Sequence, residues 1–230
     1  MSQSKAQSKT KIIIRTIVTV LFAIVVVFVP AGTFNWPEAW IFLLLYFVSV
    51  TAVLIWMKKN IPGLLKERMS KKKEIKSWDK KFFAAYSFFL IILLIVPGLD
   101  AVRFGWSEVP LFVKALGFIG FIPAMGFAFW AVKENAYASD TVRIQKERGH
   151  TVCTTGPYRY VRHPMYVGVI LFLFCLPLFL GSLYTFIPAF INIALFIMRT
   201  SLEDKALQEE LTGYKEYAQK VRYRLFPGIW

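Results

Sequence analysis

Long apolar stretches separated by charged connectors dominate this sequence. Six apolar runs stand out, at residues 12–32, 37–57, 82–101, 110–132, 165–181 and 184–199. A helix needs about 20 apolar residues to cross a bilayer core of roughly 30 Å, and these runs are near that length. The pattern predicts an all-α fold, a polytopic transmembrane helix bundle with about six spans.

Composition supports this interpretation. Of the 230 residues, 57% are apolar and 17% aromatic, and the mean hydropathy is +0.52. That balance lies well outside ordinary soluble domains. We therefore expect an integral, multi-pass membrane protein.

The placement of charge indicates the orientation of the helices. The net charge is +14, and 10 of the 28 Lys and Arg fall within residues 58–81, whereas the connector at residues 31–36 carries none. Lys and Arg collect on cytoplasmic connectors, where anionic lipids also attract them. We expect both termini, the connectors at residues 58–81 and 133–163, and the tail from Arg199 to be cytoplasmic. This placement favours membrane lipids over nucleic acid as partners.

The N-terminal region could imitate a signal peptide, because Lys5, Lys9, Lys11 and Arg15 precede an apolar stretch. Residues 12–31, however, exceed a typical signal-peptide core, and no A-x-A cleavage site follows them. They predict a retained anchor helix.

Within the first basic connector, Ile61, Leu64, Leu65 and Met69 have roughly helical spacing beside Lys66, Arg68 and residues 71–73. An interfacial amphipathic helix and a solvated connector that only sets topology both remain open. Pro123 and Pro177 each remove a backbone hydrogen bond inside an apolar run, so a kink can occur there.

The chemistry-bearing residues concentrate in the last part of the chain. We divide the chain into N-terminal membrane helices at residues 1–132 and a cofactor-binding, catalytic part at residues 133–230. The segment GHTVCTTGPYRYVRHPMYVG, residues 149–168, joins two runs and combines two His, three Tyr and two Arg with Gly and Pro. Such a composition suits a shaped pocket at the membrane surface. Only Gly181, Ser182 and Leu183 join the last two runs, which predicts a tight antiparallel hairpin.

Arg199 ends the sixth run, and Glu203 and Asp204 follow at i+4 and i+5. Opposite charges at this spacing share one helix face. The simpler interpretation is that Arg199 snorkels to the interface and the acids are solvated. Further on, Leu202, Leu207 and Leu211 suit an amphipathic tail helix that lies back on the core.

Metal binding fits the sequence poorly. His150, Cys153 and His163 give an H-x2-C-x9-H spacing that lacks a fourth ligand and matches no common zinc site, so we expect no metal. His163 precedes Pro164, which favours an extended backbone at a junction between loop and helix. There its imidazole serves either a structural hydrogen bond or a cofactor contact. The two cysteines, Cys153 and Cys175, form no disulfide framework.

The C-terminal part of the chain resembles the isoprenylcysteine carboxyl methyltransferase family and its phospholipid methyltransferase relatives. The resemblance covers about residues 133–230 and includes RHPMY, the acidic pair and GYKEY in the family's order and spacing. Residues 1–130 match only as a set of membrane helices. One departure is Glu203-Asp204, where the family usually has Glu-Glu.

The resemblance implies a cytoplasmic pocket for S-adenosylmethionine, formed by the C-terminal half, and a lipidic or prenylated substrate. Carried over by position, the cofactor-binding residues are His150, Val152, Gly156, Tyr158, His163, Pro164, Tyr166 and Glu203. The residues nearest the methyl acceptor are Arg199, Glu203 and Asp204.

The acceptor stays open at this stage. A carboxylate is ionised at pH 7 and can pair with Arg199, whereas an amine or thiol can use Glu203 or Asp204 as a proton acceptor. A second enzymatic class also resembles this family: NADPH-dependent membrane sterol and isoprenoid reductases. Basic residues of the second connector can bind a nucleotide phosphate: Arg143, Lys146, Arg148, Arg159 and Arg162. The third alternative is a non-catalytic membrane protein, which the retained polar residues disfavour.

Overall fold

The computed structural model describes residues 2–70 and 75–230, with side chains described from residue 14 onward. The described residues form helices joined by irregular connections and contain no strand. The helices are α1 (Ser2–Ala31), α2 (Pro37–Asn60), α3 (Pro62–Met69), α4 (Ser77–Pro97), η1 (Gly98–Phe104), α5 (Leu111–Glu134), η2 (Lys146–Arg148), η3 (Gly156–Arg159), α6 (Pro164–Leu180), α7 (Phe186–Glu210) and α8 (Tyr214–Lys220).

Five helical segments are long and apolar enough to cross a membrane: Ile14–Ala31, Pro37–Asn60, Ser77–Phe104, Leu111–Glu134 and Phe186–Glu210. The sixth predicted run forms α6, which is apolar but has 17 residues. At 1.5 Å per residue, α6 spans about 26 Å, slightly less than a typical bilayer core. The predicted polytopic helix bundle is therefore confirmed.

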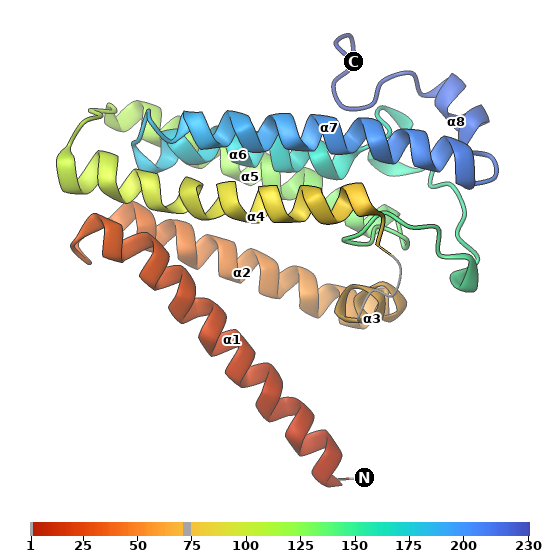
Figure 1. Ribbon diagram of the computed structural model, residues 1–230, viewed down its shortest axis with the longest axis horizontal. Coiled ribbons are helices and arrows are strands. Elements are labelled where there is room, and N and C mark those ends of the chain that lie inside the picture. Colours follow the sequence, from red (N-terminus) through yellow and green to blue (C-terminus); the bar gives the residue numbers. More distant parts are fainter. Residues whose placement is uncertain (1, 71–74) are drawn as a thin grey trace.

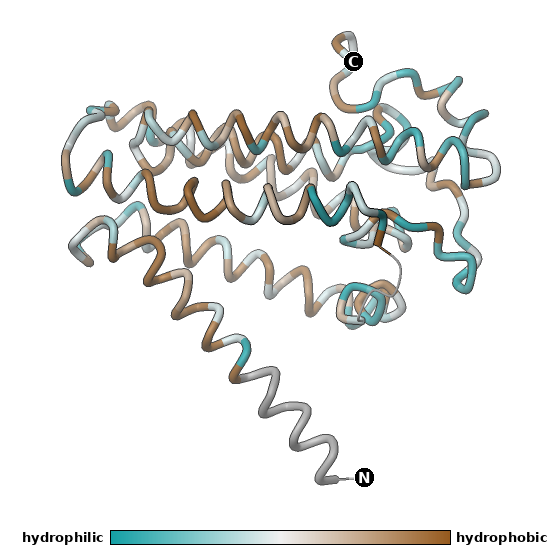
Figure 2. The backbone as a smooth tube through the Cα atoms, in the orientation of Figure 1, coloured by the Kyte–Doolittle hydropathy of each residue, from teal (hydrophilic) through white to brown (hydrophobic). Residues whose placement is uncertain are grey.

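The polar residues gather at one end of the bundle. Short connections join α1 to α2, η1 to α5 and α6 to α7 at the opposite end (Figure 1). The end that carries α3, the segment at residues 135–163 and α8 is called here the polar end. Figure 2 shows hydrophilic residues concentrated there, with hydrophobic residues along the helices. The two basic connectors and the tail thus share one end of the bundle, as expected from the sequence.

Glycines let α5 and α6 approach unusually closely. A Cβ atom added at Gly117 would lie 2.4 Å from the backbone nitrogen of Phe179, and one at Gly168 would lie 2.7 Å from the carbonyl oxygen of Ala124. Membrane helices use small residues in this way because close packing replaces the hydrophobic effect between them. The α5–α6 pair therefore forms the closely packed centre of the bundle.

The end of α4 departs from a regular α-helix. Pro97 is followed by the π-helical turn η1, which ends at Gly105 with a φ of 62°. Proline lacks the N–H that an α-helix requires, and a local π adjustment can accommodate it in a membrane helix. Within η1, the carboxylate of the buried Asp100 accepts hydrogen bonds from the hydroxyls of Ser107 at 2.7 Å and Ser182 at 2.5 Å. These bonds hold the η1–α5 and α6–α7 connections together at the far end.

Two local expectations change. The amphipathic tail helix expected from Leu202, Leu207 and Leu211 is a continuation of α7 to Glu210. Leu211 is buried and Leu207 packs against its cluster, whereas Leu202 is exposed. In the first basic connector a helix does form, α3, which buries Leu64 and exposes Met69.

Three further expectations concern connections and particular residues. The hairpin forms as expected, with α6 ending at Leu180 and α7 beginning at Phe186. Helices α5 and α6 are assigned as continuous through Pro123 and Pro177. Lys71, Lys72 and Lys73 lie outside the described residues, as do the side chains of Lys5, Lys9 and Lys11.

Candidate functional site

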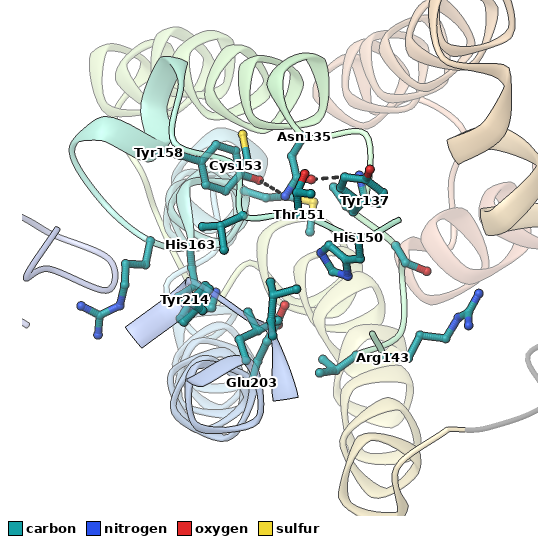
Figure 3. A pocket seen from close by; sticks show the side chains of 18 of the residues that line it. Asn135, Tyr137, Arg143, His150, Thr151, Cys153, Tyr158, His163, Glu203 and Tyr214 are labelled. Atoms are coloured by element: carbon teal, nitrogen blue, oxygen red, sulfur yellow. Dashed lines mark hydrogen bonds between the residues drawn. The ribbon is translucent and has the colours of Figure 1, made fainter. Parts of the chain in front are cut away.

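A pocket opens at the polar end, between the segment at residues 135–163 and the ends of α6, α7 and α8 (Figure 3). It contains about 720 Å³ of atom-free space, part of which is open to solvent. Its lining residues are Asn135, Tyr137, Ala138, Ser139, Thr141, Val142, Arg143, His150, Thr151, Val152, Cys153, Tyr158, Arg162, His163, Met165, Tyr166, Glu203, Leu207, Leu211, Tyr214 and Tyr217.

Charged residues of α3 hold one wall of this pocket. The Arg68 guanidinium donates two hydrogen bonds to the carbonyl oxygen of Ala138, at 3.0 and 2.7 Å. Arg143 donates to both carboxylate oxygens of Glu67, at 3.0 and 2.9 Å. Hydrogen bonds to Glu67 and Glu147 raise the pKa of Arg143 above its usual value. The first basic connector therefore fixes one wall of the pocket through α3.

His150 enters the pocket as a neutral ring. Its imidazole stacks on Tyr137 with the ring centres 4.5 Å apart, and its Nδ1 accepts a hydrogen bond from the backbone nitrogen of Gln145 at 3.3 Å. Burial, together with the positive charge of Arg148, lowers the pKa of His150 to about 4. At neutral pH the remaining proton is on Nε2, because Nδ1 is an acceptor. His150 therefore offers the pocket a hydrogen-bond donor without a charge.

A tyrosine and a carboxylate join α6 and α7 at the pocket. The Tyr166 hydroxyl donates a short hydrogen bond to Oε2 of Glu203. The rings of His163 and Tyr166 are parallel to within 3°, with centres 5.8 Å apart. Because both His163 and Tyr166 are buried, they hold the half-buried Glu203 carboxylate at the pocket surface.

Asp204 lies beside Glu203 in sequence but has a different environment. It is fully buried, and Arg162 donates to both of its carboxylate oxygens, at 2.7 and 3.0 Å. Arg224 and Gln208 donate to Oδ2 at 3.0 and 2.9 Å, and Tyr214 donates to Oδ1 at 3.1 Å. These bonds occupy the usual lone-pair positions of a carboxylate. Asp204 therefore ties the pocket wall to the tail.

Arg199 is buried, so the interpretation that its side chain snorkels to the membrane interface is wrong. Its Nε lies 3.1 Å from Oδ1 of Asp79, which is also buried, and its Nη2 donates to the carbonyl oxygen of Asp140 at 2.5 Å. Glu203 and Asp204 have other hydrogen-bond partners, so the ion pair of Arg199 is with α4 and not with its own helix. The guanidinium lies 4.6–5.5 Å from the centres of three aromatic rings, those of Phe82, Phe83 and Tyr166.

The structure brings together most of the sequence-predicted residues. Six of them line the pocket: His150, Val152, Tyr158, His163, Tyr166 and Glu203. Gly156, Pro164, Arg199 and Asp204 are not among its lining residues. Gly156 has a φ of 55° and begins η3 against the side chain of Glu134, while Pro164 is the first residue of α6. These four residues therefore lie behind the side chains that line the pocket.

Sequence reasoning did not single out several residues of the site. Tyr214 and Tyr217 lie in GYKEY and line the pocket, and the hydroxyl of Tyr217 donates to the carbonyl oxygen of Tyr158 at 2.7 Å. The repeated Tyr in that segment was a usable signal. Asp79 gave a weaker one, as an acid among Lys76, Lys80 and Lys81 at the start of an apolar run.

No set of residues that could bind a metal ion is found among residues 14–70 and 75–230. Across the described side chains, no group of three or more His, Cys, Asp and Glu could hold a metal ion. Cys153 and Cys175 are both free thiols.

The fold and the pocket define a class: a multi-span membrane protein with a pocket at the polar end of its helices. Residues 115–209 match the model of the isoprenylcysteine carboxyl methyltransferase (ICMT) family. This segment covers most of α5, all of α6 and nearly all of α7. The match confirms the resemblance to the family seen in the sequence. The family match indicates a membrane methyltransferase. A comparison with curated proteins found no match.

Proposed function

We propose that the protein transfers a methyl group from S-adenosylmethionine to a hydrophobic, membrane-embedded acceptor. The observation that carries the proposal is the Glu203 carboxylate, held by Tyr166 at the surface of a pocket in the ICMT-matched segment. A fixed carboxylate there complements the positive charge of a sulfonium donor. The pocket faces the cytoplasm in this proposal, because the basic connectors share its end of the bundle.

The pocket residues fit such a cofactor. Its wall combines the aromatic faces of Tyr137 and His150 with the polar groups of Asn135 and Glu203. The Thr141 hydroxyl is buried and has no hydrogen-bond partner, so it is free to bind a ligand. Aromatic faces, neutral donors and one carboxylate suit a base, a sugar and a cationic centre.

The bound cofactor supplies an activated methyl group, so the chain's own residues need mainly to hold and orient. Proximity and alignment can contribute about 7–11 kcal/mol to such a reaction. Tyr166 and His163 restrain Glu203 from one side. On the other side, the ion pairs of α3 hold the segment at residues 135–150 against the pocket. This arrangement limits the motion of whatever binds between them.

For the acceptor, we propose the carboxylate of a prenylated cysteine or a similar lipid. Arg199 is the buried cation nearest to Glu203 along α7, and a carboxylate is already ionised at neutral pH. The alternative is an amine or thiol acceptor, for which Glu203 is the better-placed proton acceptor. Asp204 suits that role poorly, because its oxygens already accept hydrogen bonds from Arg162, Arg224 and Tyr214.

The reductase alternative lacks free cations at the pocket. Arg143 binds Glu67 and Glu147, Arg162 binds Asp204, and Arg148 donates to the carbonyl oxygen of Ala136 at 2.8 Å. Only Lys146 and Arg159 of the five candidate basic residues are exposed. A nucleotide phosphate would need to break existing ion pairs to bind here.

Calorimetric titration of the detergent-purified protein with S-adenosylhomocysteine, and separately with NADPH, tests the proposal. We expect binding of the former, weakened at least tenfold by Glu203→Gln and unchanged by Glu209→Gln, an exposed acid on the same helix. Transfer of a labelled methyl group to S-prenylcysteine or to an aminophospholipid then distinguishes the acceptors. Binding of NADPH alone would replace the proposal with the reductase, and binding of neither ligand would favour a non-catalytic protein.

A further inference from the structure

We propose that Asp79 is a positioning residue for methyl transfer, which acts by holding Arg199 and the pocket wall at residues 140–142. This inference rests on the proposed function. Asp79 lies near the start of α4, outside residues 115–209 that match the family. It would give the N-terminal membrane helices a direct part in the site.

The Asp79 carboxylate contacts two groups, the backbone of Val142 and the guanidinium of Arg199. The residue is fully buried, and its Oδ2 accepts a hydrogen bond from the backbone nitrogen of Val142 at 3.0 Å. Its Oδ1 lies 3.1 Å from Nε of Arg199. Arg199 in turn donates to the carbonyl oxygen of Asp140. One carboxylate therefore links α4, α7 and the pocket wall.

Of the two residues that contact Asp79, Val142 lines the pocket and Arg199 lies against Tyr166, which also lines it. Val142 and its neighbour Thr141 line it directly. The Arg199 guanidinium lies 5.5 Å from the centre of the Tyr166 ring, and Tyr166 donates to Glu203. A shift of Asp79 would move the wall and the guanidinium together.

Unsatisfied polar atoms mark this position. The described residues contain five buried side-chain nitrogen or oxygen atoms without a hydrogen bond, and three of them are Asp79 Oδ1, Thr141 Oγ1 and Arg199 Nε. Buried polar atoms are nearly always hydrogen-bonded, so a group of exceptions close together calls for a physical explanation. Two of the three, Asp79 Oδ1 and Arg199 Nε, face each other at 3.1 Å as an ion pair without a hydrogen bond of good geometry. The third, the Thr141 hydroxyl, lines the pocket and can bind a ligand there.

Charge gives Asp79 a second effect on Arg199. A buried guanidinium without a counter-charge is strongly unfavourable, and the Asp79 carboxylate is its ion-pair partner. The pair holds the guanidinium at one position against the rings of Phe82 and Phe83. Arg199 is thus oriented before any acceptor arrives, which reduces the cost of binding one.

Asp79→Asn tests the inference, because an amide keeps the size and the acceptor for Val142 but removes the charge. Asp100→Asn is the matched control: Asp100 is also fully buried and lies in the same Ser77–Phe104 span, but at the opposite end of the bundle. The assay measures S-adenosylhomocysteine affinity, thermal midpoint, and kcat and KM for the acceptor that the wild type methylates. We expect Asp79→Asn to lower kcat/KM for the acceptor at least tenfold and to change S-adenosylhomocysteine affinity less than threefold.

A double-mutant cycle with Arg199→Gln separates positioning from stability. If Asp79 acts through Arg199, Asp79→Asn has less than a twofold effect on kcat/KM in the Arg199→Gln background. Equal losses in Asp79→Asn and Asp100→Asn, or full additivity in the cycle, would overturn the inference and leave the proposed function intact. A wild type that neither binds S-adenosylhomocysteine nor methylates either acceptor would remove the proposed function and this inference with it.

Discussion

Arg162 donates hydrogen bonds to both carboxylate oxygens of Asp204, and both residues are buried. The second terminal nitrogen of Arg162 donates to the carbonyl oxygens of Val221 and Arg222, at 2.7 and 2.8 Å. The pair therefore joins the pocket wall, α7 and the tail in one network. Its geometry makes it a structural centre of the site.

Removing the Asp204 carboxylate should destabilise the protein strongly. In Asp204→Ala the guanidinium of Arg162 stays buried without its counter-charge, and such a loss costs about 3–5 kcal/mol. We expect a clear fall in the thermal midpoint together with loss of S-adenosylhomocysteine binding. The control is Lys205→Ala, whose side chain is 74% exposed and which should change stability by less than about 0.5 kcal/mol. An Asp204→Ala protein of wild-type stability would contradict the structural role.

Removing the hydroxyl of Tyr166 should affect activity more than stability. Tyr166→Phe keeps the ring that stacks on His163 and faces Arg199, but it releases the Glu203 carboxylate. A hydrogen bond to a charged group contributes roughly 1.5–3 kcal/mol, so kcat/KM should fall about tenfold to a hundredfold. Steady-state methylation kinetics measure this. Tyr184→Phe, a half-exposed tyrosine at the other end of the bundle, should leave the kinetics unchanged.

The His150 ring should make stability dependent on pH. Its pKa is lowered from 6.5 to about 4 in the folded protein, so between these values the unfolded chain binds more protons than the folded one. The contribution of His150 to stability is therefore fully present above pH 6.5 and is lost as pH falls towards 4. Thermal midpoints of wild type and His150→Gln across this range should converge at low pH. Parallel curves for the two proteins would show that His150 does not titrate in this way.

The close contact of α5 and α6 should tolerate no added side chain. Gly117→Ala would place a Cβ atom 2.4 Å from a backbone nitrogen of α6, and such overpacking costs about 1–3 kcal/mol. Gly126 lies on the same helix with open space around it, so Gly126→Ala should be neutral or stabilising by up to about 1 kcal/mol. The difference between the two thermal midpoints is the measurement. Equal midpoints would mean that the two helices are less tightly packed than described.

The helices were predictable from the sequence because a long apolar run has few alternatives to a membrane helix. The π-turn η1 was not, since it depends on how the chain adjusts locally after Pro97. Likewise, α7 continues past Arg199 because its polar extension packs Asp204 and Ala206 inward, and hydropathy alone misses such an extension.

Part of the site was also predictable from the sequence. His150, Tyr158, His163 and Tyr166 lie in one short, unusual segment, so composition alone drew attention to them. Asp79 is distant from them in the chain, and only the packing of α4 on α7 brings it to Arg199. Arg162 was easy to notice in the sequence, as a candidate phosphate ligand, but its role there was misjudged. In the structure its charge is neutralised by an ion pair with Asp204. The role of a charged residue depends on its partner, and a single sequence does not identify that partner.

The tail that reaches back to Asp204 has a consequence for how the protein is made. Backbone nitrogens of Arg162 and His163 donate to the carbonyl oxygens of Tyr223 and Arg224, and the Arg224 guanidinium binds Asp204. While the ribosome is still synthesising the tail, the membrane helices can already be inserted, but the Asp204 network lacks Arg224. The pocket can therefore reach its final form only after residue 224 has left the ribosome, so the site is completed after most of the helices have formed.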